Sequence, residues 1–111
     1  MWLWEGLVPV APGLALAFFV SIVASTKNGT LYTGSTDEIG RRIWEHKEKL
    51  RPGFTADYGV DRLVWYEAHE TRDSAFQREG RIKKWNRVRK LELIERMNPG
   101  WVDLFETLGP P

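Results

Sequence analysis

Four residues in this chain of 111 could together carry out chemistry on a phosphate: Tyr32, Arg42, His46 and Glu79. A phenol can relay a proton, a guanidinium can hold a phosphate through two hydrogen bonds, and a carboxylate can bind a hard divalent cation. Arg42 and His46 are four residues apart, so they share one face if their segment is helical. These residue types suit a metal-dependent phosphodiesterase.

Each of the four also has a purely structural explanation. Tyr32 could be an ordinary half-buried strand residue, and His46 could be an exposed residue on a helix. Arg42 could pair with Glu38 one turn earlier in a helix. Glu79 could form an i, i+4 ion pair with Lys83, which contributes only about 0.2–0.5 kcal/mol. Residue types alone therefore favour the structural interpretation, at least for Tyr32.

The composition narrows the choice of metal and partner. There is no cysteine, which excludes disulfides and thiolate metal sites, and two histidines are too few for a typical zinc site. A divalent ion would be held mainly through oxygen, which favours Mg²⁺ or Mn²⁺. All 16 lysines and arginines lie between Lys27 and Arg96 with 12 of the 15 acidic residues, a surplus of four positive charges. This surplus permits an anionic partner without requiring one.

The N-terminal part of the chain is uncharged from Gly6 to Thr26. Its apolar stretch could be a signal peptide or a membrane anchor. Against this, Glu5 replaces the expected positive residue, prolines interrupt the first half, and residues 18–24 favour a buried strand. We therefore expect a cytoplasmic protein without membrane attachment, in which residues 1–17 form an extension of unassigned role. An anchored or exported protein is the less favoured alternative.

The remaining pattern predicts one domain over residues 18–106, followed by a tail at 107–111. Runs of apolar, β-branched and aromatic residues, together with turn signals, predict strands at 18–25, 30–34 and 62–67. Apolar spacing and stop signals predict helices at about 35–50, 71–84 and 86–97. The order ββαβαα predicts an α+β fold, with a small three-stranded antiparallel sheet flanked by helices.

Two local features refine this prediction. Ser35 and Glu38 match the Ser-x-x-Glu capping box, so Ser35 is expected to open the first helix. The candidate core residues on the helices and in the aromatic set are Ile39, Ile43, Trp44, Leu50, Trp65, Ala75, Phe76, Ile82, Val88, Leu91, Leu93, Ile94, Met97 and Trp101.

Five segments, in order, carry a family resemblance. They are Asn28–Gly34, Arg41-Arg42-x-x-Glu45-His46, Phe54–Glu67, Arg78–Trp85 and Leu93–Leu104. Together they resemble the GIY-YIG endonuclease superfamily, specifically its small single-domain branch related to the nuclease domain of the excinuclease C subunit. The resemblance covers residues 18–106, and five ordered segments are far more specific than a single Tyr-x-Gly.

This resemblance implies an endonuclease that hydrolyses nucleic-acid phosphodiesters with one Mg²⁺ or Mn²⁺ ion. It implies that Tyr32 activates water, Arg42 clamps the phosphate, His46 assists and Glu79 holds the metal. The implied partner is nucleic acid, DNA more than RNA, in a role such as DNA repair. No protein partner is implied.

The resemblance also suggests which basic residues contact nucleic acid. They are Arg41, Lys83, Lys84 and Arg87, the last three within a run of six basic residues between Arg81 and Lys90. Trp85 lies in this run and could either stack on a base or pack inward.

One position departs from the family pattern. Ser21 stands where the first motif has a tyrosine, and serine has a much shorter reach. Asn86 lies near the family's late asparagine, but its spacing does not match. The alternative function is therefore a non-catalytic nucleic-acid-binding module on the same fold.

Overall fold

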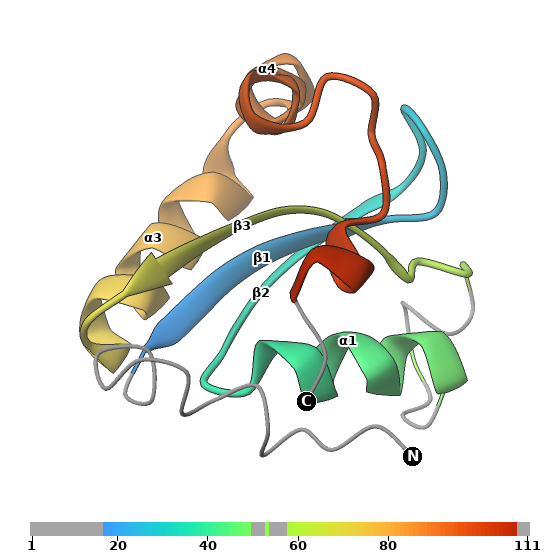
Figure 1. Ribbon diagram of the computed structural model, residues 1–111. Coiled ribbons are helices and arrows are strands. Elements are labelled where there is room, and N and C mark those ends of the chain that lie inside the picture. Colours follow the sequence, from blue (N-terminus) through green and yellow to red (C-terminus); the bar gives the residue numbers. More distant parts are fainter. Residues whose placement is uncertain (1–16, 50–52, 54–57, 109–111) are drawn as a thin grey trace.

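The computed structural model describes residues 17–49, 53 and 58–108 of the chain (Figure 1). Its strands are β1 (Phe18–Ala24), β2 (Leu31–Thr36) and β3 (Arg62–His69). Its helices are α1 (Ile39–Glu48), α3 (Arg72–Lys84), α4 (Arg87–Met97) and the 3₁₀ helix η4 (Leu104–Leu108). The predicted α+β fold is confirmed. The N-terminal extension, apart from Ala17, and most of the segment between α1 and Tyr58 lie outside the described residues.

The three strands form one antiparallel sheet in the order β2-β1-β3. Ser21 on the central strand lies opposite Gly34 of β2 and Tyr66 of β3. The pairing of β1 with β3 is irregular at Ile22 and Val23, where the register shifts. The side chains of the edge strand β2 alternate between the two faces of the sheet, so successive residues meet elements on opposite sides.

Helices cover both faces of this sheet (Figure 1). Val20, Ile22 and Ala24 face one way and form a core with Ile82 of α3 and Ile94 of α4. The opposite face packs against α1 and η4, with Val23, Leu63, Ile39 and Ile43 as buried members. The alternation along β1 follows from the strand period of two. The central strand is therefore apolar on both faces, as its sequence predicted.

The predicted capping box does not form. Ser35 is still part of β2, and α1 begins only after Glu38, which provides no side-chain cap. Instead the Thr36 hydroxyl oxygen accepts a hydrogen bond from the Glu38 backbone N–H, at 3.0 Å. The prediction failed because the Ser35 hydroxyl bonds to a carboxylate on another helix.

The core prediction is right for some residues and wrong for others. Trp65 and Trp101 are buried, as are Ala75, Ile82 and Ile94. The exposed large apolar residues include four that were expected in the core: Trp44, Phe76, Val88 and Met97. These residues lie on helices that contact the sheet through one face only, so apolar side chains elsewhere on the helix stay in solvent.

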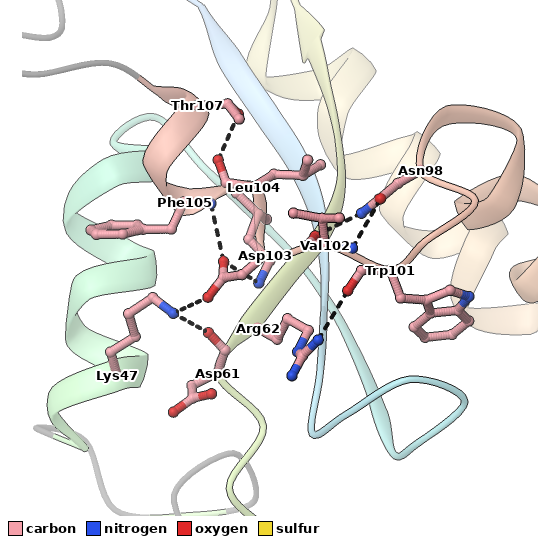
Figure 2. Close-up of polar contacts among 11 residues, drawn as sticks. Lys47, Asp61, Arg62, Asn98, Trp101, Val102, Asp103, Leu104, Phe105 and Thr107 are labelled. Atoms are coloured by element: carbon pink, nitrogen blue, oxygen red, sulfur yellow. Dashed lines mark hydrogen bonds and ion pairs between the residues drawn. The ribbon is translucent and has the colours of Figure 1, made fainter.

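The C-terminal segment is fastened back onto β3 and α1 by two side chains (Figure 2). Buried Asn98 donates to the carbonyl oxygens of Val64 and Val102 and accepts from the Val102 N–H. Asp103 accepts from the backbone N–H groups of Leu63 and Phe105. Asp103 also pairs with Lys47 of α1. The end of the domain is thereby joined to its middle.

Within the part of the chain that the structure describes, no helix has the length and apolar character needed to cross a membrane.

Candidate active site

A shallow hollow lies between β1, β2 and α1 and encloses about 200 Å³, a volume that includes open solvent. Its lining residues are Ser21, Tyr32, Gly34, Ser35, Thr36, Arg42 and His46. Three of the four residues that the sequence singled out for chemistry are in this set, although they come from a strand and a helix.

Local structure explains why these side chains converge. Tyr32 and Gly34 are two residues apart on β2, so they share a face of the sheet, and Gly34 pairs with Ser21. On α1, Ile43 is fully buried against that face. Arg42 and His46 are one helical turn apart and both line the hollow. The rings of Tyr32 and His46 contact edge to face, with centroids 6.1 Å apart.

Glu79 reaches the margin of the hollow from α3. Its Oε1 accepts a hydrogen bond from the Ser35 hydroxyl at 2.6 Å, across 44 residues of sequence. Its Oε2 lies 2.6 Å from Lys83 Nζ, in the ion pair that the sequence suggested. The same Nζ lies 5.9 Å from the centroid of the Tyr32 ring. Ser35 and Lys83 therefore connect the fourth predicted residue to the other three.

The donor set around Glu79 is compatible with one hard divalent ion. Among the described residues, no three His, Asp or Glu side chains gather as a multidentate metal site. Mg²⁺ usually keeps several waters and takes one or two carboxylates with phosphate oxygens. A single glutamate near a hollow lined by an arginine fits that mode of binding, and Mg²⁺ or Mn²⁺ at Glu79 stays a prediction.

The basic residues predicted to contact nucleic acid lie in different settings. Arg41, on the solvent side of α1, pairs with Glu38 at 3.4 Å, so this glutamate is paired with Arg41 in place of Arg42. Lys84 is exposed. Arg87 Nη2 donates to the carbonyl oxygens of Asn28 and Gly29, each at 2.7 Å, and so joins α4 to the β1–β2 turn.

Trp85 packs inward. It is half-buried against the core on the α3 side of the sheet. The guanidinium carbons of Arg89 and Arg78 lie 4.1 and 5.4 Å from its ring centroid. The indole is thus held between two arginines.

Two residues of interest were missed by sequence reasoning. Ser35 was assigned to a helix cap, and nothing in its local pattern indicates a partner on α3. His69 was not singled out by the sequence, and its side chain is only 13% exposed. Its Nε2 lies 2.7 Å from Glu67 Oε1 and its Nδ1 lies 2.6 Å from Ser74 Oγ. The alternation that places Glu67 and His69 on one face of β3 could have suggested their contact.

The chain belongs to the GIY-YIG family. The GIY-YIG catalytic domain matches residues 18–92. The chain is 36% identical over 90 residues to a UPF0213 protein of Desulfotalea psychrophila, covering 80% of this chain and 81% of the relative. It is 35% identical over 72 residues to a UPF0213 protein of Staphylococcus saprophyticus, covering 65% of this chain and 88% of the relative.

A solved structure agrees with this assignment. The solution NMR structure of a UPF0213 protein from Bacillus halodurans matches with a TM-score of 0.50 and 28% sequence identity. The match covers 78% of this chain and 92% of that one.

Proposed function

We propose that this protein is a metal-dependent endonuclease that hydrolyses phosphodiesters in nucleic acid, with DNA as the preferred substrate. The observation that supports this most directly is the hollow lined by Tyr32, Arg42 and His46, with Glu79 at its margin. Membership of the GIY-YIG family supports the same reaction class.

Each side chain has a role that its position permits. Arg42 holds the scissile phosphate and offsets the negative charge that develops as water attacks phosphorus. Tyr32 relays the proton of that water, and His46, in contact with the Tyr32 ring, orients or assists it. One ester P–O bond breaks, and the leaving alkoxide takes up a proton. A Mg²⁺ or Mn²⁺ ion held by Glu79 would supply further charge stabilisation at the phosphate.

Substrate binding outside the hollow would depend on basic side chains. Exposed Arg41 and Lys84 can contact the phosphate backbone, and Lys83 and Arg87 can do so where their present contacts allow. These contacts would carry no base specificity, because phosphates are the same in every sequence.

A nicking assay on supercoiled plasmid with Mg²⁺ or Mn²⁺ tests the proposal. We expect the full chain to nick the plasmid, and Glu79→Gln and Arg42→Ala each to lower the rate by about a hundredfold or more. Glu92→Gln and Arg96→Ala remove the same charges at exposed positions of α4 and should leave the rate within about twofold. Failure to cut any DNA or RNA substrate, with Glu79→Gln indistinguishable from wild type, would contradict the proposal.

A second candidate is a non-catalytic nucleic-acid-binding module on the same fold, and Ser21 is the observation that favours it. Ser21 lines the hollow and is only 6% exposed, so no phenol extends from this position toward a substrate. Ser21→Tyr distinguishes the two candidates. If the variant cuts much faster than wild type, the natural protein is a weakened enzyme. If both proteins bind nucleic acid and neither cuts it, the protein is a binding module.

A further inference from the structure

Lys83 forms an ion pair with the carboxylate oxygen of Glu79 that is not bonded to Ser35. Lys83 Nζ lies 2.6 Å from Oε2, while the Ser35 hydroxyl lies 2.6 Å from Oε1. Both oxygens of the proposed metal ligand are therefore engaged by groups of the protein itself. Before Glu79 can offer Oε2 to a divalent cation, it has to release the ammonium.

The two partners of Glu79 differ in how easily they can leave. Ser35 is fixed by its place in β2, and its hydrogen bond holds the carboxylate toward the hollow. Lys83 has a flexible stem, and its side chain is 49% exposed against 13% for Glu79. An ammonium with this exposure can move into water or onto another anion without disturbing the core. Lys83 is thus the exchangeable partner and Ser35 the permanent one.

Lys83 also lies near a group that lines the hollow. Its Nζ lies 5.9 Å from the centroid of the Tyr32 ring, and Tyr32 lines the hollow with Arg42. Movement of the ammonium away from Glu79 and past this ring would carry it toward a phosphate held by Arg42. Lysine suits this exchange because its charge is compact and its stem is flexible, whereas arginine binds through a fixed planar fork.

We propose that Lys83 is an exchangeable counter-ion of Glu79, which neutralises the carboxylate in the free protein and leaves it when a divalent cation binds. The inference rests on the proposed function, since it takes Glu79 as the metal ligand. It adds a positioning residue whose ion pair opposes cation binding and whose ammonium then serves the bound phosphate. Glu79 would otherwise be a little-exposed carboxylate with only one hydrogen-bond donor.

Calorimetric titration with Mn²⁺ in the absence of nucleic acid tests the exchange. We expect Lys83→Met to bind Mn²⁺ about three- to tenfold more tightly than wild type, because the competing ion pair is gone. Lys84→Met is the matched control, since it removes the same charge from the next residue, which is exposed and forms no ion pair with Glu79 in the described part of the chain. It should tighten binding by less than about twofold. Lys83→Arg, which can keep the ion pair, should stay close to wild type.

The Mn²⁺ affinities of the variants distinguish failure of the Lys83 exchange from failure of the metal site at Glu79. Equal effects of Lys83→Met and Lys84→Met, or weaker Mn²⁺ binding by Lys83→Met, would overturn the exchange. Mn²⁺ binding that survives Glu79→Gln unchanged would overturn the metal site itself. As a second measurement, Lys83→Met should bind a DNA duplex in the presence of Mn²⁺ about threefold or more weakly than Lys27→Met, which removes the same charge from an exposed residue outside the proposed binding set. The opposite order would contradict a role for Lys83 at the phosphate.

Discussion

Ser35 shows, at the scale of single residues, how a side chain can serve the site instead of the helix beside it. By sequence it belongs to a capping box, yet its hydroxyl donates to Glu79 on α3. A hydrogen bond to a carboxylate is stronger than one to a neutral backbone group, which favours this partner. The result is that Glu79 is held beside the hollow, and α1 begins without the cap that its sequence offers.

Tyr32→Phe should lower the rate of plasmid nicking by about a hundredfold or more, while the affinity for DNA changes little. The substitution keeps the ring that contacts His46 and Lys83 and removes only the hydroxyl. Single-turnover cleavage measures the rate, and a separate titration measures the affinity for DNA. Tyr66→Phe is the control, because that ring packs on Phe19 and is outside the lining of the hollow. Equal losses in the two variants would show that the Tyr32 phenol has no specific role.

At the scale of elements, the edge strand β2 is where the site assembles. Its Tyr32 and Gly34 line the hollow with α1, and its Ser35 bonds to α3. Side chains of one strand alternate between the two faces of a sheet, so β2 meets α1 through Tyr32 and α3 through Ser35. Two glycines, Gly34 on β2 and Gly80 on α3, lead to different predictions: substitution of Gly34 should affect the reaction, and substitution of Gly80 should affect stability.

Gly80→Ala should stabilise the protein by about 0.5–1 kcal/mol. Gly80 lies inside α3, where alanine has the higher helix propensity, and an added Cβ would meet no atom within 4 Å. Urea denaturation of the variant and wild type measures the change in the free energy of unfolding. A loss of stability would mean that the space beside Gly80 is needed for another purpose.

Gly34→Ala should instead reduce nicking while the protein remains folded. An added Cβ would lie 3.3 Å from Cε2 of Tyr32, so the ring would have to shift by a few tenths of an ångström. We expect the cleavage rate to fall by about tenfold, since small displacements of a catalytic group are costly. Circular dichroism should show the native fold. A rate equal to that of wild type would show that the position of the Tyr32 ring is not critical.

At the scale of the whole molecule, the C-terminal segment closes the domain. Asp103 bonds to β3 through Leu63, to η4 through Phe105 and to α1 through Lys47 (Figure 2). Lys47 also lies over the Phe105 ring, 5.3 Å from its centroid. The helix that carries Arg42 and His46 is therefore held partly by a residue more than fifty positions further along the chain.

Asp103→Ala should lower the free energy of unfolding by about 2 kcal/mol, because two backbone N–H groups lose their acceptor and Lys47 loses its partner. Glu106→Ala, at an exposed acidic residue of η4, should change stability by less than about 0.5 kcal/mol. Urea denaturation followed by tryptophan fluorescence measures both. If the two variants lose the same stability, the contacts of Asp103 do not hold the segment.

The sequence determined much of the fold, because the relevant signals are local. The apolar run of β1, the Asn28-Gly29 turn and the apolar spacing of α4 each depend on neighbouring residues and predicted the right elements. Buried Trp65 and Trp101 also followed from their place in a strand and near a helix end. The ordered motifs indicated the family, which the comparison confirms.

Only the tertiary structure decided which side chains meet. The bond between Ser35 and Glu79 spans 44 residues, and no local pattern encodes it. The exposure of Trp44 and Phe76 depended on which face of each helix met the sheet, which propensity does not specify. Local sequence thus set the elements, and packing across the edge strand set the surroundings of Glu79, because contacts distant in sequence form only once the chain has folded.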